Sequence, residues 1–252
     1  MNPFSLEGKK ILITGASSGI GRTVAIEASL AGANIVICGR NSERLNKTFD
    51  LLHRIYNQRH ERIVFDLADE LATSATIHQL SDFDGIVFAA GSDLIQPFSF
   101  TTSQQLKSIM DDNFTGQVLM LQKLIKTKKI NQGASIVFFS SVNGTSIGSK
   151  GHSLYAAAKG AINGLVRVLA NELSKKKIRV NAIAPGMVET GLMKMNEEIV
   201  SQELLEEHRK DYPLGFGRPE DVAYLCIYLL STASVWMTGQ SITIDGGLGI
   251  NR

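Results

Sequence analysis

Ile11-Leu12-Ile13-Thr14-Gly15-Ala16-Ser17-Ser18-Gly19-Ile20-Gly21 is the stretch that decides the fold of this chain. Its apolar start predicts a strand, its glycines predict a tight turn, and the apolar repeats that follow predict a helix. A strand, a glycine turn and a helix in this order form a dinucleotide-binding fingerprint. Glycine lets the backbone approach a pyrophosphate, and the helix N-terminus offers unpaired N–H groups and a partial positive charge. The alternative is a flexible turn without a ligand.

Apolar runs alternate with helical patterns along the rest of the chain. The runs predict seven strands, at residues 11–13, 35–38, 63–65, 86–89, 136–139, 180–184 and 242–244. The patterns between and around them predict six helices, at residues 20–31, 42–54, 71–80, 102–129, 153–175 and 219–230. Near-continuous apolar strands are typical of parallel sheets covered on both faces. The chain is therefore predicted to be α/β, with a Rossmann-type doubly wound parallel sheet and right-handed crossovers.

Length and patterning predict one domain. The 252 residues contain no linker, repeat or low-complexity tract, so we expect residues 1–252 to form a single dinucleotide-binding and catalytic domain. Residues 187–213 depart from the alternation and carry Met187, Met193 and Met195. Methionine is adaptable and suits a mobile lid over a substrate, although ordinary packing explains it equally well.

Composition excludes several functional classes. A formal net charge of +2 argues against a nucleic-acid partner. The sequence has no long apolar stretch that predicts a membrane span, and its first residues do not resemble a signal peptide. The two cysteines, Cys38 and Cys226, indicate neither a metal site nor a disulfide framework. We therefore expect a reduced, cytoplasmic protein without a metal.

Tyr155-Ala-Ala-Ala-Lys159 carries the clearest sign of chemistry. Residues four apart share one face of a helix, and a nearby ammonium group favours the ionised form of a phenol. A tyrosine assisted in this way can exchange a proton with a carbonyl or carbinol oxygen. The pair by itself is weak evidence, because the spacing is also common on ordinary helix surfaces.

Further motifs occur in order after the glycine turn. They are Asp66-Leu67, Ala89-Ala90-Gly91, Asn113, Ser140-Ser141, Asn181-Ala182-Ile183-Ala184-Pro185-Gly186, Thr238-Gly239-Gln240 and Asp245-Gly246-Gly247. With the Tyr155 motif they resemble the short-chain dehydrogenase/reductase family over nearly the whole chain, and most of all its 3-oxoacyl-acyl-carrier-protein reductase type. One departure is Phe88-Ala89-Ala90-Gly91, where the family usually has Asn-Asn-Ala-Gly. The missing asparagine leaves open how the fourth strand is braced.

The resemblance implies a catalytic set of Asn113, Ser141, Tyr155 and Lys159. In it Tyr155 is the general acid/base, Lys159 lowers the pKa of Tyr155, Ser141 binds the carbonyl oxygen, and Asn113 supports a water that relays protons. It also implies a set of cofactor-binding residues: Gly15, Ser17, Ser18, Gly19, Ile20, Gly21, Arg40, Asn41, Asp66, Leu67, Ala89, Ala90, Gly91, Tyr155, Lys159, Pro185, Gly186, Val188 and Thr190.

The second strand indicates which cofactor is used. An NAD-binding chain usually has a carboxylate there that bonds the ribose 2′-OH, whereas this chain has Cys38-Gly39-Arg40-Asn41. The planar guanidinium group of Arg40 can form paired hydrogen bonds with a 2′-phosphate, so NADP is favoured over NAD. Arg22 is a weaker second candidate. Asp66 matches the adenine-side residue of the family, and the alternative for Asp66 is a helix cap.

Substrate and partners are less constrained. We expect a partly apolar pocket from Phe98, Ile147, Leu154, Met187, Leu192 and Met193. The leading function is reduction of a carbonyl compound, with a 3-oxoacyl thioester first. The alternatives are a sugar, polyol or other small-alcohol dehydrogenase, and a dinucleotide-sensing module without catalysis. His152 is either a substrate contact or a solvated loop histidine.

The resemblance also implies a homotetramer and an acyl carrier protein as a partner. Apolar residues on more than one face of the helices predicted at 102–129 and 153–175 agree with subunit contacts. Lysines near the ends of the same two helices are candidates for carrier-protein docking: Lys123, Lys126, Lys128, Lys129, Lys175, Lys176 and Lys177. Their simpler role is to complement the helix dipoles.

Overall fold

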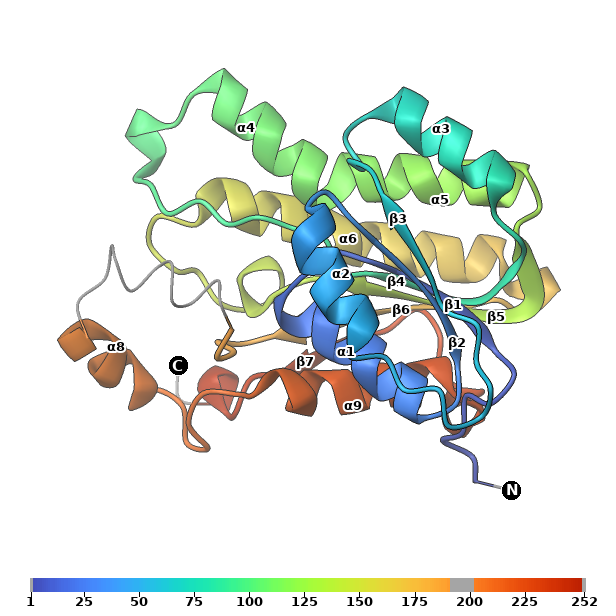
Figure 1. Ribbon diagram of the computed structural model, residues 1–252. Helices are drawn as coiled ribbons and strands as arrows, with labels where there is room; N and C mark the ends of the chain where they lie inside the picture. Colours follow the sequence, from blue (N-terminus) through green and yellow to red (C-terminus); the bar gives the residue numbers. More distant parts are fainter. Residues whose placement is uncertain (1, 191–201, 251–252) are drawn as a thin grey trace.

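The structure, a computed structural model, describes residues 2–190 and 202–250 (Figure 1). Seven strands form one parallel sheet in the order β3-β2-β1-β4-β5-β6-β7. The strands are β1 Lys10–Thr14, β2 Asn34–Gly39, β3 Glu61–Val64, β4 Phe83–Phe88, β5 Ile130–Phe139, β6 Arg179–Pro185 and β7 Ser241–Ile244. The reversal of strand order at β1 is that of a doubly wound sheet, so the predicted fold class is confirmed.

Helices cover both faces of the sheet (Figure 1). The helices are α1 Gly19–Leu30, α2 Ser42–Asp50, α3 Glu70–Gln79, α4 Ser103–Met110, α5 Gly116–Lys126, α6 Ser153–Glu172, α8 Gln202–Arg209 and α9 Pro219–Leu230. Helices α1 and α9 lie on one face, and α3, α5 and α6 lie on the other. None of the described helices is long and apolar enough to cross a bilayer.

Two apolar cores follow from the two-residue period of the strands. Ile11 and Ile13 point into the core under α1 and α9, while Leu12 between them points into the core under α5 and α6. The same alternation recurs on the neighbouring strand β2 with Ile35 and Val36. Continuous apolar runs are therefore required in the central strands, because both faces of each are buried.

The helix predicted at residues 102–129 is confirmed as a continuous helical run over residues 103–126, and its predicted end at residue 129 is wrong. The chain forms α4, then a π-helical segment at Asp111–Thr115, then α5, which ends at Lys126. Lys128 then takes a left-handed conformation with φ of +57°, and β5 begins at Ile130 rather than at residue 136. The amide of Phe83 donates to the Lys129 carbonyl, so pairing with β4 draws this segment out of the helix.

Other element ends differ by a few residues. Helix α2 stops at Asp50 instead of residue 54, and α6 stops at Glu172, followed by a 3₁₀ turn at Ser174–Lys176. Strand β3 begins at Glu61 and is largely exposed, because it is the edge of the sheet and no strand pairs beyond it. Such shifts at element ends reflect tertiary pairing that local patterns do not encode.

The carboxyl ends of the strands meet at one edge of the sheet, because all seven strands are parallel. Gly15, Arg40, Gly91, Ser141 and Gly186 follow β1, β2, β4, β5 and β6, respectively. In open parallel sheets this edge binds ligands, and the point where the strand order reverses lies within it. The fold therefore gathers the residues singled out in the sequence along one edge.

Candidate active site

The glycine turn after β1 is held in contact with the turn after β4. Gly15 has a φ of +65°, and a Cβ built on it would lie 2.5 Å from the Ala90 nitrogen. A Cβ on Gly21 would lie 2.5 Å from the Gly15 carbonyl oxygen. Both positions exclude any larger residue, since real Cβ contacts are not this short. The close packing argues against a merely flexible turn.

The N-terminus of α1 is open toward this edge. Ser18 is the N-cap residue, and its hydroxyl makes no capping hydrogen bond to the helix. Thr190 lies beside the first turn, with its Cγ2 3.6 Å from where a Cβ of Gly19 would stand. Unpaired N–H groups with a threonine alongside suit an anionic phosphate, so the turn fits the pyrophosphate of a dinucleotide.

Arg22 braces the turn rather than facing a ligand. Its Nη2 donates to the Ser17 carbonyl at 2.6 Å, and its Nε donates to Thr48 Oγ1 at 3.0 Å. These two bonds tie the glycine turn to α2. Arg22 is therefore already engaged, which weakens it as an alternative site for a 2′-phosphate.

Arg40 lies between two carboxylates at the end of β2. Its Nη1 is 3.6 Å from Asp66 Oδ2 and 3.3 Å from Asp112 Oδ1. The Ser92 hydroxyl donates to the other Asp112 oxygen at 2.7 Å. More than half of the Arg40 side chain is exposed, so these pairs are weak and can exchange for a phosphate. The sequence offered no sign of the Asp112 contact.

Two of the predicted cofactor-binding residues, Asn41 and Asp66, also accept hydrogen bonds from nearby backbone amides. The Asn41 side chain caps α2 by accepting from the Arg44 amide at 2.8 Å, and its carbonyl accepts from the Leu45 amide at 3.0 Å. Asp66 Oδ1 accepts from the Ala68 amide at 3.0 Å, while the cap of α3 is Asp69. The alternative reading of Asp66 as the helix cap is therefore wrong.

Lys159 is buried at the centre of the site. Its side chain is 4% exposed and its Nζ donates to the Phe139 carbonyl at 2.9 Å. Burial lowers the pKa of Lys159 to about 8, although the nearby Asp93 carboxylate acts in the opposite direction. Its Nζ lies 5.6 Å from the centre of the Tyr155 ring. Lysine and tyrosine thus face one another, as the helical spacing predicted.

The pKa of Tyr155 is set by its surroundings. Burial and, to a smaller extent, the Asp93 carboxylate raise the pKa of Tyr155 to about 12, against a hydrogen bond with Ser141 that acts to lower it. The net shift is upward because desolvation of the phenolate is the largest effect on this group. The Tyr155 phenol is therefore protonated at neutral pH.

Ser140 and Ser141 point to different partners. The Ser140 hydroxyl donates to the Lys159 carbonyl at 2.9 Å, which fixes it to α6. Ser141 accepts from the Asn143 amide at 3.2 Å and bonds Tyr155. A Cβ on Gly144 would lie 2.6 Å from the Lys159 carbonyl carbon, so only glycine lets this loop lie against α6. Ser141 reaches Tyr155 for this reason.

Asn113 lies in the π-helical segment and is fully buried, not on the helix surface that its sequence position alone suggests. Its Nδ2 donates to the Ser92 and Ile109 carbonyls at 2.9 and 3.0 Å. Its Oδ1 has no hydrogen-bond partner in the described chain. A Cβ on Gly91 would lie 2.6 Å from this oxygen and 3.4 Å from Lys159 Nζ. A buried acceptor beside an ammonium group suits an ordered water.

Gln117 braces the end of β4. It is fully buried, and its Nε2 donates to the Ala90 carbonyl at 2.7 Å. The turn at Ala89-Ala90-Gly91 lacks the asparagine that the resembled family carries, and Gln117 supplies a hydrogen bond to this turn from α5. The residue was not singled out in the sequence, since a glutamine next to Gly116 has no distinguishing local pattern.

The contact between Asp93 and His152 was also not expected from the sequence. Asp93 Oδ2 lies 3.3 Å from His152 Nε2, next to Tyr155. They come from the loop after β4 and from the residue before α6, which are far apart in sequence. His152 is thus an ion-pair partner and not the solvated loop histidine that was the alternative.

The structure brings together only some of the residues that were expected to form an apolar substrate pocket. Ile147 packs with Tyr212 and Phe216, and Leu154 packs with Ile109 and Ala158, so both belong to small apolar clusters. Met187 packs against the first cluster, whereas Phe98 is 71% exposed. Leu192, Met193 and Met195 lie outside the described residues.

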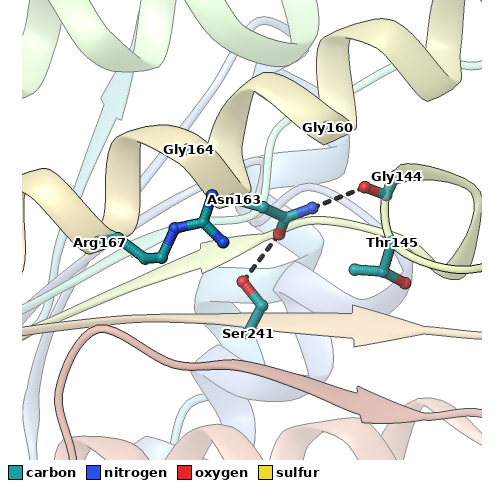
Figure 2. Close-up of a pocket in the computed structure, with 7 residues that line it drawn as sticks. All are labelled: Gly144, Thr145, Gly160, Asn163, Gly164, Arg167 and Ser241. Atoms are coloured by element: carbon teal, nitrogen blue, oxygen red, sulfur yellow. Dashed lines mark hydrogen bonds between the residues drawn. The ribbon is translucent and has the colours of Figure 1, made fainter.

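A separate groove lies between α6, the turn at Gly144 and Thr145, and the start of β7 at Ser241 (Figure 2). It is lined by Gly144, Thr145, Gly160, Asn163, Gly164, Arg167 and Ser241. Asn163 crosses it, donating to the Gly144 carbonyl at 2.7 Å and accepting from the Ser241 hydroxyl at 2.8 Å. The residues that line the groove are not among the predicted catalytic or cofactor-binding residues. The two hydrogen bonds of Asn163 connect α6 to the turn after Ser141 and to β7.

Comparison with known proteins places the chain among oxidoreductases. The family model described as enoyl-(acyl carrier protein) reductase matches residues 15–249. A tropinone reductase homolog of Arabidopsis thaliana is 34% identical over 98% of this chain and 95% of its own length. A 3-oxoacyl-(acyl-carrier-protein) reductase of Aquifex aeolicus is 29% identical over 97% of this chain and 99% of its own.

A solved structure of a dehydrogenase is also similar to this chain. A putative 2-deoxy-D-gluconate 3-dehydrogenase of Agrobacterium tumefaciens with bound NADP superposes with a TM-score of 0.88. The two chains are 29% identical, and the match covers 100% of each. The names of the three relatives point to different kinds of substrate, while the fold is shared with the solved structure.

Proposed function

Because the chain belongs to the short-chain dehydrogenase/reductase family, whose members are nicotinamide-dependent oxidoreductases, we propose that it is an NADPH-dependent reductase of carbonyl compounds. The observation that carries the proposal is the meeting of Tyr155, Ser141 and Lys159 at the edge of the sheet beside the glycine turn. A module that only senses dinucleotides has no need of this proton-transfer set, and the family model that matches this chain is described as a reductase.

The residues at this edge fit a nicotinamide dinucleotide. Gly15, Gly19 and Gly21 would hold the pyrophosphate at the start of α1, with Thr190 alongside. Other predicted contacts lie along the same edge: Ser17, Ser18, Ile20, Asn41, Asp66, Leu67, Ala89, Ala90, Gly91, Pro185, Gly186 and Val188. When bound, the reduced cofactor supplies a hydride to the carbonyl carbon of the substrate.

The protein supplies the proton and the orientation. The Tyr155 phenol is neutral at neutral pH and donates its proton to the carbonyl oxygen as that oxygen gains charge. The Ser141 hydroxyl donates a hydrogen bond to the same oxygen and stabilises its charge. Lys159, with a pKa of about 8, is mostly protonated at neutral pH and would restore the proton through a water bound at the unpartnered Asn113 Oδ1.

Arg40 supports the proposed preference for NADPH. We expect Arg40→Asp to weaken NADPH binding by at least about tenfold and to change NADH binding little, because a new carboxylate would face a 2′-phosphate dianion. Protein-fluorescence titration with both cofactors measures the ratio. Asp112→Asn is the matched variant, and it should strengthen NADPH binding because it removes an anion that holds Arg40. An unchanged NADPH/NADH ratio in Arg40→Asp would remove Arg40 from the phosphate site.

For the substrate, we propose a 3-oxoacyl thioester, and a sugar, polyol or other small alcohol is the alternative. The Aquifex relative supports the first and the Agrobacterium relative supports the second. A panel of acetoacetyl thioesters, sugars and simple ketones, assayed with NADPH and NADH, separates them. Activity confined to sugars would contradict the thioester proposal, and activity on no carbonyl would contradict the reductase proposal.

Carrier-protein docking is a finer part of this proposal. Lys123 and Lys129 are engaged within the chain, with Glu70 and the Leu80 carbonyl, respectively, whereas Lys126 and Lys128 are exposed. Docking through exposed lysines should weaken with salt, since screening shortens electrostatic reach. Turnover of an acyl group on carrier protein should then fall with ionic strength and in Lys126→Glu/Lys128→Glu. Turnover of the same group on a small thioester should not change.

We propose that the enzyme assembles as a homotetramer in the cytoplasm, with residues 187–213 as a substrate lid in the single domain. Large apolar side chains are exposed on the described surface, including Val168 on α6 and Trp236, which is 99% exposed. Exposed apolar side chains on several elements are available for subunit contacts. Both cysteines are buried and unpaired, which agrees with a reducing compartment. Light scattering that shows a stable monomer at micromolar concentration would contradict the assembly.

A further inference from the structure

Asp93 and His152 join two loops next to Tyr155. The Asp93 side chain is 14% exposed and the His152 side chain 18% exposed, so the pair is largely shielded from water. The Gln96 amide donates to the Gly151 carbonyl at 2.9 Å, a second bond between the same loops. A shielded pair of this kind is more strongly coupled than a surface ion pair.

Both ring nitrogens of His152 face acceptors. Nε2 lies 3.3 Å from the Asp93 carboxylate, and Nδ1 lies 3.2 Å from the Lys150 carbonyl. Neither partner can donate a hydrogen bond, because one is a carboxylate and the other a backbone carbonyl. A neutral imidazole has a single N–H and satisfies only one of them. The imidazolium satisfies both, so the contacts select the protonated ring.

The pair directly adjoins α6, the helix that carries Tyr155 and Lys159. His152 is the residue before α6, and its carbonyl accepts from the Ala156 amide at 2.7 Å. Its ring lies edge-on to the Tyr155 ring, with the centroids 6.2 Å apart. Asp93 uses its second oxygen to accept from the Leu94 amide at 2.8 Å, so the carboxylate is fixed in place. Both residues therefore contact the first turn of α6, which carries Tyr155, through the bonds of His152.

We propose that Asp93 and His152 are a positioning pair that holds Tyr155 in place and whose protonated state is required for full activity. The proposal deepens the reductase function and rests on it for its kinetic part. In the protonated state the pair is neutral as a whole. After His152 loses its proton, the charge of Asp93 stands uncompensated near Tyr155 and one of the two ring contacts is lost.

The charge environment agrees with this assignment. The hydrogen bond with Asp93 raises the pKa of His152 above its ordinary value of 6.5, in spite of the opposing effect of burial. The same carboxylate also raises the pKa values of Tyr155 and Lys159. Lys150 contributes its carbonyl, and its side chain is exposed. Because the folded pKa of His152 is raised, its contacts are complete below pH 6.5 and are lost as the pH rises through the raised value.

Proton NMR of the histidine rings tests the pair without reference to activity. The chain has five histidines, and His152→Gln identifies the His152 signal by its disappearance. We expect that signal to titrate above pH 6.5 in the wild type and at a lower pH in Asp93→Asn. A wild-type midpoint at or below 6.5, or the same midpoint in Asp93→Asn, would overturn the pairing.

Kinetics tests the link to Tyr155. The ratio of kcat/KM of the wild type to that of His152→Gln should fall several-fold between about pH 6 and about pH 8.5, because glutamine does not titrate. Groups shared by both proteins, such as Lys159, cancel in the ratio. The control is His78→Gln, which changes an exposed histidine on α3 and should give a ratio independent of pH. A flat ratio for His152→Gln would overturn the role of the pair in catalysis. If no carbonyl compound is reduced, the reductase function fails, while the NMR titration still decides the pairing.

Discussion

Tyr155→Phe is expected to lower kcat by about 10²–10⁴, because the variant keeps the ring but has no proton to donate to the carbonyl oxygen. The phenol is the neutral donor of the site, with a pKa of about 12, and Ser141 is its hydrogen-bond partner. NADPH binding should stay nearly unchanged, since phenylalanine retains the shape of the ring. Steady-state turnover and cofactor fluorescence titration measure the two effects separately.

The control for this variant is Tyr224→Phe. Tyr224 lies on α9 and is 56% exposed, so its hydroxyl is remote from the site and kcat should not change. Near-wild-type turnover of Tyr155→Phe on the true substrate would show that Tyr155 is not the acid. The proposed mechanism would then need another proton donor at the carbonyl oxygen.

Gly15→Ala should remove most of the cofactor binding and lower the melting temperature. The residue has a φ of +65°, which costs an L-residue about 1–2 kcal/mol. The new Cβ would also stand 2.5 Å from the backbone of the neighbouring turn, and overpacking of this kind costs about 1–3 kcal/mol more. The turns after β1 and β4 must separate, and the pyrophosphate site opens with them. Thermal unfolding and cofactor titration measure the change.

Gly133→Ala is the control that separates backbone strain at a positive φ from the steric clash of a new Cβ. Gly133 has a φ of +79°, but a Cβ built on it has no neighbour within 4 Å. It should therefore lower the melting temperature through backbone strain alone and leave cofactor binding intact. In a chain of this size about 1 kcal/mol corresponds to roughly 2–4 °C. Equal effects of the two variants would show that the close contact at Gly15 is not important.

Much of the fold could be predicted because its signals are local. The apolar run Ile11-Leu12-Ile13 is continuous since both faces of β1 are buried, and the glycines follow it because two backbones meet there. Each parallel strand brings the residue after it to the same sheet edge, so Arg40 and Ser141 could be assigned to one site from order alone. The failures were at element ends, such as residue 129, where pairing with β4 decides the conformation.

The sequence by itself determined the sheet, the cofactor edge and the spacing of Tyr155 and Lys159, because strand and helix periods are properties of neighbouring residues. Only the tertiary structure decided that Asn113 is buried in a π-helical segment, that Gln117 braces the Ala90 turn and that Asp93 pairs with His152. It also decided the direction of the pKa shift of Tyr155. Burial and contacts between distant segments set these features, and neither is encoded in the local pattern around any one residue.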